Sequence, residues 1–294
     1  MKAPNLVSVV IAAYNMGRYL PAAIRSVLQQ TYSNFEINVV DDGSTDDTAT
    51  IMRQFTTNPA IRYHRQNNGG QAKAKNVGIK EARGDYVAFL DADDMWVSDK
   101  LEKQLPCFEN SPSVGVVYTN VRCIDNEGNP LPTPSRAHYT GRITGPLLID
   151  NFVTGMASIV RKECFEEVGV FDESLPMGID YDLWLRISTK YEFAYLDHVT
   201  YLYRQWPGQM SHNHSKRYEC AVAIMSQFLE KNPGLVDRRI VNRAWAHTYV
   251  GRGDSLITMD NPRHEAFKYY LRALKVCPTY VPAWKQIVKL LLRK

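Results

Sequence analysis

Short apolar runs alternate with longer segments of helical periodicity along the first part of the chain. The apolar runs lie at residues 6–13, 35–40, 61–64, 86–90 and 114–118, and the helical segments lie between them, at about 18–30, 46–57, 70–82 and 98–110. The runs are continuous rather than alternating, as in strands that are covered on both faces. This pattern predicts an α/β fold with a mostly parallel sheet, flanking helices and right-handed crossovers.

The rest of the chain departs from this alternation. The expected elements are a turn at residues 125–130 followed by an irregular loop, a strand at 155–161, and helices at 161–168 and 180–191. From Lys216 onward the periodicity is helical to the end. We therefore expect an α/β domain over residues 1–215 and a helical C-terminal extension over residues 216–294.

Composition indicates a folded protein of the cytoplasm. The chain has 294 residues, of which 45% are hydrophobic, enough for a large core. Its five cysteines are scattered and include no Cys-x-x-Cys pair, which argues against a zinc site or a disulfide framework. The apolar run near the N-terminus lacks a convincing cleavage site and is interpreted as the first strand. No segment approaches the roughly 20 apolar residues that span a bilayer.

Charge is unevenly distributed. Residues 216–294 contain fifteen Lys or Arg and six Asp or Glu, a net charge of +9, which leaves −5 for residues 1–215. Within the last helical segment, Lys285, Lys289, Arg293 and Lys294 alternate with apolar residues. This extension could bind anionic lipid headgroups at the inner face of a membrane, a phosphorylated lipid acceptor or an acidic partner. The alternative is a solvated basic face. No nucleic-acid partner is expected.

Acidic motifs follow two of the predicted strands. Asp41 and Asp42 end the second strand, and Asp91-Ala92-Asp93 follows the fourth. In open parallel sheets, ligands bind beyond the carboxyl ends of the strands. Mg²⁺ and Mn²⁺ share their coordination between one or two carboxylates, phosphate oxygens and water. The pattern predicts a metal-diphosphate site, although helix capping near Asp46 or a solvated acidic loop would also account for single motifs.

These motifs occur together with others in a recognisable order. The segments concerned are residues 8–15, 41–48, 68–78, 91–94, 178–186 and 203–212. Together they resemble the family 2 glycosyltransferases of the GT-A fold over residues 5–212. The glycines at residues 69 and 70 belong to neither a P-loop nor a dinucleotide-binding fingerprint, so those two classes have no support.

The resemblance implies roles in binding a nucleotide-sugar donor. The implied donor-binding residues are Ala13, Tyr14, Asn15, Asp42, Gly70, Lys75, Asp91, Ala92 and Arg204. Tyr14 offers a face for stacking, and the Asp42 carboxylate can accept a hydrogen bond from a uracil N–H, which favours a UDP-sugar. Lys75 stands where relatives often carry Arg, which keeps the charge but loses bidentate geometry.

The resemblance also implies a metal and a base. Asp93, with Asp91 as a second ligand or a ribose contact, would hold Mn²⁺ or Mg²⁺. Trp206 replaces a His that is common in the family, so His212 or His214 is a candidate substitute ligand. Asp180 matches the family's catalytic base, although Ile179 stands in place of the usual Glu.

Alternatives remain for the identity of the catalytic base and for the class of the protein. Asp182 competes with Asp180 for the base, but it is also suited to stabilise the start of a helix. The resemblance implies an inverting, metal-dependent glycosyltransferase that moves a sugar from a nucleotide-diphosphate donor to a hydroxyl of a glycan or a lipid-linked acceptor. The rival classes are an inactive nucleotide-binding scaffold, suggested by Ile179, and a sugar nucleotidyltransferase, which should carry a glycine-rich basic loop after its first strand.

Overall fold

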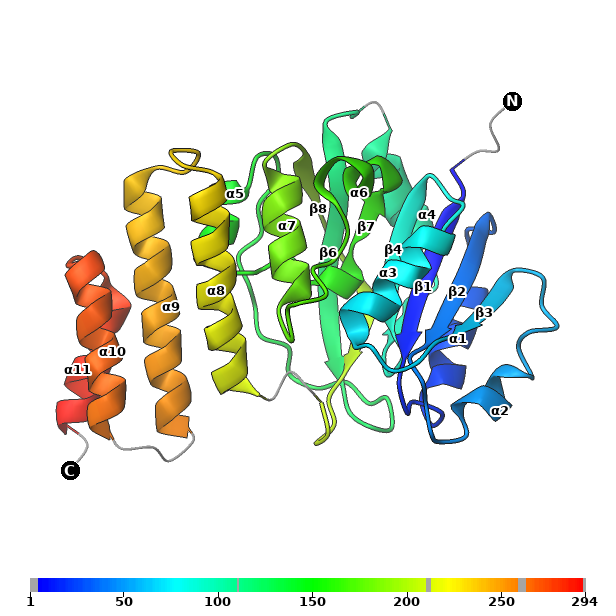
Figure 1. Cartoon of the computed structure of the whole chain (residues 1–294), viewed down its shortest axis with the longest axis horizontal. Coiled ribbons are helices and arrows are strands. Elements are labelled where there is room, and N and C mark those ends of the chain that lie inside the picture. Colours follow the sequence, from blue (N-terminus) through cyan, green and yellow to red (C-terminus); the bar gives the residue numbers. More distant parts are fainter. Residues whose placement is uncertain (1–4, 110, 210–212, 259–262, 293–294) are drawn as a thin grey trace. The chain divides into compact units, whose positions relative to one another are not determined.

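The structure is a computed structural model of the whole chain, and it describes residues 5–109, 111–209, 213–258 and 263–292 (Figure 1). The chain divides into two compact units. The first consists of residues 1–142 and 153–207, and the second of residues 143–152 and 208–294. Residues 143–152 therefore belong with the C-terminal helices, an association that the sequence pattern did not predict.

The first unit contains an eight-stranded mixed sheet in the order β3-β2-β1-β4-β7-β6-β8-β5. Its strands are β1 (Val7–Ala13), β2 (Phe35–Asp41), β3 (Ile61–Arg65), β4 (Tyr86–Asp91), β5 (Met95–Trp96), β6 (Val114–Ile124), β7 (Ile159–Arg161) and β8 (Glu192–Arg204). The neighbouring pairs β3-β2, β2-β1, β1-β4 and β6-β8 are parallel, whereas the pairings of β7 and β5 are antiparallel.

The expected α/β class is confirmed, and the five predicted apolar runs correspond to β1, β2, β3, β4 and β6. The strand expected at 155–161 is shorter, because its first half forms the 3-10 turn η2 (Gly155–Ala157). The sequence pattern missed β8. This strand carries Asp197, His198 and other polar residues, and much of it is only half-buried, so its sequence lacks the continuous apolar run of the central strands.

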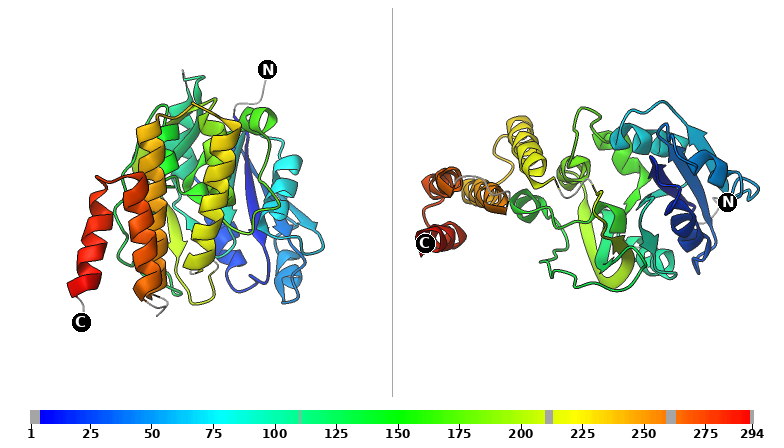
Figure 2. Two further views of the ribbon diagram at one scale, coloured as in Figure 1. Left: turned by 60° about the vertical axis from the view of Figure 1, so that its left-hand side comes forward. Right: turned by 90° about the horizontal axis from the view of Figure 1, so that it is seen from below.

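Helices lie on both faces of this sheet (Figure 2). They are α1 (Leu20–Leu28), α2 (Thr48–Met52), α3 (Gln71–Glu81), α4 (Lys100–Gln104) with η1 (Leu105–Phe108), α6 (Lys162–Val168) and α7 (Ile179–Ser188). Helix α3 approaches β1 closely, since a Cβ on Gly78 would lie only 2.2 Å from Cγ1 of Val10. The backbone of α3 is thereby held against the strand that leads to Tyr14.

A buried lysine braces η2 from within the core. Lys100 is fully buried, and its Nζ donates to Oε1 of Gln104 at 2.6 Å and to the carbonyl oxygen of Ala157 at 2.9 Å. Oγ1 of Thr200 lies 3.5 Å from the same nitrogen. These partners are neutral oxygens, and burial holds the pKa of Lys100 well below its ordinary value.

We expect Lys100 to make the stability of the protein depend on pH. A lowered pKa means that the folded protein binds fewer protons than the unfolded chain, so the free energy of unfolding rises with pH up to about 10.5, by at most about 1.4 kcal/mol per pH unit. Urea unfolding of the wild type and of Lys100→Met between pH 7 and about 10 measures this. The stability of the wild type should rise relative to that of the variant. Lys103 is exposed on α4, so the difference in stability between the wild type and Lys103→Met should not change with pH. If the stability of Lys100→Met follows that of the wild type in parallel over this pH range, the assignment is contradicted.

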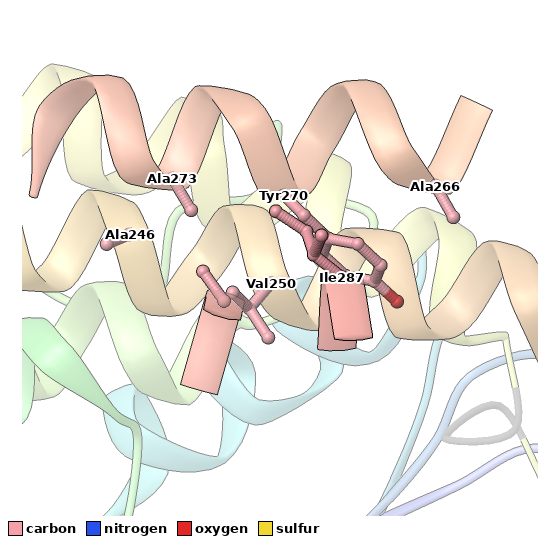
Figure 3. Close-up of a cluster of buried hydrophobic side chains, with 7 residues drawn as sticks. Ala246, Val250, Ala266, Tyr270, Ala273 and Ile287 are labelled. Carbon is pink, nitrogen blue, oxygen red and sulfur yellow. The ribbon is translucent and has the colours of Figure 1, made fainter. Parts of the chain in front are cut away.

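The second unit is helical and contains α5 (Thr144–Ile149), α8 (His214–Lys231), α9 (Arg238–Thr258), α10 (Arg263–Val276) and α11 (Val281–Leu292). Its core includes Ala246, Val250, Ala266, Tyr270, Ala273, Ala283 and Ile287 (Figure 3). The alanines allow close packing of helices around Tyr270, whose hydroxyl donates to Asp254 at 2.7 Å. Among the residues that the structure describes, no helix combines the length and apolar character needed to cross a membrane.

Candidate functional site

The ends of β2, β1 and β4 lie side by side and bring their polar residues together. Ala13 of β1 is in register with Asp41 of β2, and Ala12 is in register with Asp91 of β4. The backbone N–H of Asp42 donates to the carbonyl oxygen of Ala13 at 2.8 Å. Three of the motifs found in the sequence therefore meet at one edge of the sheet.

Asp41, the last residue of β2, and Asp42, the first residue after it, have different roles. Asp41 is fully buried and accepts hydrogen bonds from the Tyr63 hydroxyl and from the backbone N–H of Ser44, both within 2.8 Å. Asp42 accepts from the backbone N–H groups of Gly69 at 2.9 Å and Gly70 at 2.8 Å. Asp41 therefore shapes the turn, whereas Asp42 fixes the loop before α3.

Asp42 has one further donor. The side-chain nitrogen of Gln66 donates to Oδ1 at 2.6 Å, which makes three bonds in all to this carboxylate. A carboxylate has roughly four acceptor positions, so one more donor can be accommodated. Gly70 has a φ of +88°, a conformation that favours glycine, and this allows its N–H to point at Asp42.

The turn after β1 is held by a second set of bonds. Asn15 has a positive φ of 54°, and its Oδ1 accepts from the backbone N–H of Thr45 at 2.8 Å. Its own N–H donates to Oγ of Ser44 at 2.9 Å. Asparagine tolerates this left-handed conformation better than most residues. Tyr14 lies beside it with 46% of its surface exposed, so an aromatic face is open at the strand end.

A buried lysine reaches the end of β4. Nζ of Lys75, on α3, lies 3.0 Å from Oδ1 of Asp91, and only 2% of the lysine side chain is exposed against 36% of the aspartate. The same nitrogen lies 3.5 Å from the sulfur of Met156 in η2. Ala92, the next residue after Asp91, is buried. Lys75 thus brings a positive charge to the edge of the sheet and is paired with a partly exposed carboxylate.

Asp93 is linked to the end of β8 and to the segment that follows this strand. Its Oδ2 accepts from Nε1 of Trp206 at 2.8 Å, and its carbonyl oxygen accepts from Nε of Arg204, also at 2.8 Å. Nη1 of Arg204 donates to the carbonyl oxygens of Asp125 and Asn126. Arg204 is buried and braces two loops, a role that the sequence did not reveal. Its expected contact with a diphosphate stays a prediction.

Asp94 lies beneath this acidic segment. It is buried, and it accepts from the Tyr201 hydroxyl at 2.6 Å and from the backbone N–H of Arg204 at 2.7 Å. Burial, followed by the nearby Asp93 and Asp91 carboxylates, raises the pKa of Asp94 well above its ordinary value. Asp94 ties the acidic segment to β8 and is a structural residue.

Asp180 and Asp182 are both in the first turn of α7 and have different surroundings. Asp182 is buried and forms an ion pair with Arg186 at 2.7 Å, and Arg186 also donates to the carbonyl oxygens of Val168 and Val170. Oδ1 of Asp180 accepts from the backbone N–H of Tyr181 at 2.9 Å. Asp182 therefore has a structural role, because it holds Arg186 in place against the segment before α7.

Glycine allows η2 to lie against Asp180. A Cβ on Gly155 would be 3.0 Å from Cβ of Asp180 and 3.4 Å from its Oδ2. The next residue, Met156, contacts Lys75. Consequently, η2 connects the surroundings of Asp180 with the Lys75–Asp91 pair, and this connection was not visible in the sequence because it depends on a turn in place of the expected strand.

The side chains after β4 could bind a hard cation only if phosphate oxygens or water supply most of its ligands. Asp91 and Asp93 supply carboxylate oxygens, the ligand type that Mg²⁺ and Mn²⁺ prefer, and such ions need only one or two of them when phosphates complete the coordination. Within residues 5–109, 111–209, 213–258 and 263–292, no group of three or more His, Cys, Asp or Glu side chains is placed to hold a metal ion. His212 lies outside the described residues, and so does the side chain of His214.

The sequence of this chain is similar to known glycosyltransferases. Residues 8–169, more than half of the chain, match the family model described as Glycosyl transferase family 2. An uncharacterised glycosyltransferase of Rickettsia typhi is 34% identical over 235 residues, which cover 77% of this chain and 72% of the relative. Chondroitin synthase of Escherichia coli is 32% identical over 208 residues, which cover 68% of this chain and 29% of that enzyme. The chain likewise spans only 38%, 26% and 31% of the length of three other Rickettsia relatives.

Solved structures share the fold. S. aureus TarS 1–349 in complex with UDP-GlcNAc superposes with a TM-score of 0.70 at 21% identity, over 91% of this chain and 79% of that one. The mannosyltransferase PcManGT from Pyrobaculum calidifontis, in complex with GDP-Man and Mn²⁺, gives a TM-score of 0.59 at 18% identity, over 100% and 89% of the two chains. These likenesses concern the fold, whereas the family model and the relatives above 30% identity concern the sequence. The chain belongs to glycosyltransferase family 2.

Proposed function

We propose that this protein transfers a sugar from a UDP-sugar to a hydroxyl group of a glycan or lipid-linked acceptor, with inversion at the anomeric carbon. The observation that carries the proposal is the register of β2, β1 and β4, which pairs Asp41 with Ala13 and Asp91 with Ala12 at one edge of the sheet. A donor lying across this edge would reach Asp42, Tyr14 and the Lys75–Asp91 pair. This is the place where open α/β sheets bind ligands.

Uridine suits the Asp42 environment. Three donors already use the Asp42 carboxylate, and the remaining acceptor position can take the imide N–H of uracil. The exposed ring of Tyr14 offers a stacking face beside it. Ala13, Asn15 and Gly70 would shape the pocket through their backbones. The fold neighbour S. aureus TarS was solved with UDP and with UDP-GlcNAc, which supports this choice of nucleotide.

A divalent cation fits the acidic segment after β4. Asp93 would hold Mn²⁺ or Mg²⁺ together with the donor diphosphate, and Asp91 or water would complete the coordination. When bound, the ion would neutralise charge on the diphosphate leaving group. Lys75 adds a fixed positive charge next to Asp91. PcManGT, a fold neighbour, was solved with Mn²⁺ and GDP-Man, which supports the use of a divalent cation.

Asp180 would act as the general base. Its carboxylate would accept the proton of the acceptor hydroxyl while that oxygen attacks the anomeric carbon from the side opposite the departing nucleotide. Asp182 is less suited to this role, because it is buried and paired with Arg186.

The nucleotide-sugar donor and the acceptor would meet in the cytoplasm. Residues 1–215 would act as the catalytic domain, and the C-terminal helices would be an accessory part.

A ligand screen by thermal unfolding tests the proposal. In the presence of Mn²⁺, UDP-sugars should raise the melting temperature more than GDP- or dTDP-sugars do, since a ligand at 100 times its Kd stabilises by about 2.7 kcal/mol. The absence of any shift with all three nucleotides would contradict a donor site. UDP binding without sugar transfer or donor hydrolysis would favour the rival interpretation, an inactive nucleotide-binding scaffold. Nucleotidyl transfer from a nucleoside triphosphate would favour the other rival class, a sugar nucleotidyltransferase.

A further inference from the structure

Helix α11 has two apolar sides, and only one of them is packed. Ala283 and Ile287 are buried in the helical core shown in Figure 3. Other apolar side chains of α11 are exposed, and we call this set the apolar stripe. It consists of Val281, Trp284, Val288, Leu291 and Leu292, which are 57%, 52%, 51%, 72% and 78% exposed.

The stripe is a continuous surface and not a scatter of single residues. Its members follow one another at intervals of three, four, three and one residues, which places them on one side of a helix with 3.6 residues per turn. In the described part of the chain, they are five of the ten large hydrophobic residues that are strongly exposed. Single exposed apolar residues are normal on soluble proteins, but a contiguous apolar patch marks a binding surface.

Charge indicates what covers the stripe. Lys285 and Lys289 are exposed and lie one turn apart on α11, where they continue the surface next to Trp284 and Val288. Helix α11 contains no acidic residue, and residues 216–294 carry a net charge of +9. A second copy of the chain would bring two basic rows together, and like charges oppose that contact. An anionic lipid surface complements both the apolar and the basic side chains.

The indole N–H of Trp284, in the stripe, has a hydrogen-bond partner within the chain, so the ring can be transferred out of water at little cost. Nε1 of Trp284 already donates to the carbonyl oxygen of Pro278 at 2.9 Å. Burial of an indole normally costs free energy if its N–H loses a partner. Because this bond is internal to the chain, the exposed ring can enter an apolar layer without leaving its N–H unpaired.

We propose that α11 docks on membranes that contain anionic lipids, with the apolar stripe inserted between headgroups and with Lys285 and Lys289 at the lipid phosphates. Such a contact would bring the protein to lipid-linked acceptors. The proposal does not depend on the sugar-transfer activity, and its test can succeed or fail independently of that activity.

Cosedimentation of the full chain with vesicles tests the proposal. Vesicles of phosphatidylglycerol and phosphatidylcholine should pellet the protein at low salt, whereas vesicles of phosphatidylcholine alone should pellet much less. The triple variant Trp284→Ser/Val288→Ser/Leu291→Ser should lower the binding constant by at least about tenfold. The double variant Lys285→Gln/Lys289→Gln should lower it by about fivefold per lysine and weaken its dependence on salt.

Matched controls are available at other exposed positions. Leu235→Ser and Leu271→Ser remove exposed leucines outside the stripe, and Lys80→Gln/Lys103→Gln removes two exposed lysines of α3 and α4. These variants should bind vesicles like the wild type. Three results would overturn the proposal: a wild-type protein that stays in the supernatant at low salt, vesicle binding that survives the triple variant, or a concentration-dependent dimer that the triple variant abolishes. Circular dichroism confirms that each variant remains helical.

Discussion

Replacement of Asp180 by asparagine is expected to lower the rate of sugar transfer by about 10²–10⁴-fold while UDP affinity stays within a few-fold of the wild type. The reason is that a general base acts on the acceptor and does not need to hold the donor. Asparagine retains an oxygen that can accept the hydrogen bond from the N–H of Tyr181, so the start of α7 is preserved. Single-turnover transfer rates and UDP titration measure the two quantities.

The neighbouring carboxylate provides the matched control. Asp182→Asn removes the charge that pairs with Arg186, whose other bonds fasten the loop before α7. Loss of one partner of a largely buried pair costs stability, so this variant should unfold at a lower temperature and yet transfer sugar at a rate near that of the wild type once folded. Normal transfer by Asp180→Asn, with loss of transfer in a folded Asp182→Asn, would move the base to Asp182. Loss of UDP binding in Asp180→Asn would instead place that carboxylate in the donor site.

Chelation of divalent cations is expected to abolish transfer, and added Mn²⁺ or Mg²⁺ should restore it. Asp93→Ala should weaken UDP binding by at least about tenfold when metal is present and change it little when metal is absent, because the carboxylate would act through the ion. Isothermal titration with and without Mn²⁺ gives both affinities. Full activity in excess chelator would overturn the metal assignment and leave Lys75 as the positive charge at the diphosphate.

The variant Asp93→Asn distinguishes a role of Asp93 in metal binding from a role as the hydrogen-bond acceptor of Trp206. The asparagine oxygen can still accept from Nε1 of Trp206, a bond of 2.8 Å in the structure, but it removes the negative charge. If Asp93 only positions Trp206, this variant should restore UDP binding relative to Asp93→Ala. If Asp93 holds a cation, both variants should lose the metal-dependent part of the affinity.

The central strands could be predicted because burial on both faces leaves a continuous apolar run. Residues of β1 from Val7 to Ile11 are fully buried, and their sequence is almost entirely apolar. Strand β8 was missed because its half-buried faces accept Asp197 and His198. Helix α5 was missed because its six residues are too few for a periodic pattern and include Pro146. The predicted elements are therefore those whose environment is uniform along their length.

The acidic residues of the candidate site could be found in the sequence because each ends a strand or begins a helix. Their partners could not. Gln66 meets Asp42, and Met156 meets Lys75, across 24 and 81 residues of chain. Such pairings follow from tertiary packing and leave no local signal. Trp206 was noted only as a departure from a family pattern, and its bond to Asp93 shows what the indole contributes here.

The order of synthesis imposes a delay on helix α5. Ile149, at its end, is followed by 88 residues before Arg238 begins α9, the helix whose Ile240 lies against Gly145. At about 5–20 residues per second, a ribosome needs roughly 5–20 s to make that stretch. During this time the apolar Leu147 and Leu148, which are fully buried in the finished protein, have no partner from α9. A truncated chain that ends before α9 would keep this surface permanently, so early termination yields an aggregation-prone fragment and not a smaller enzyme.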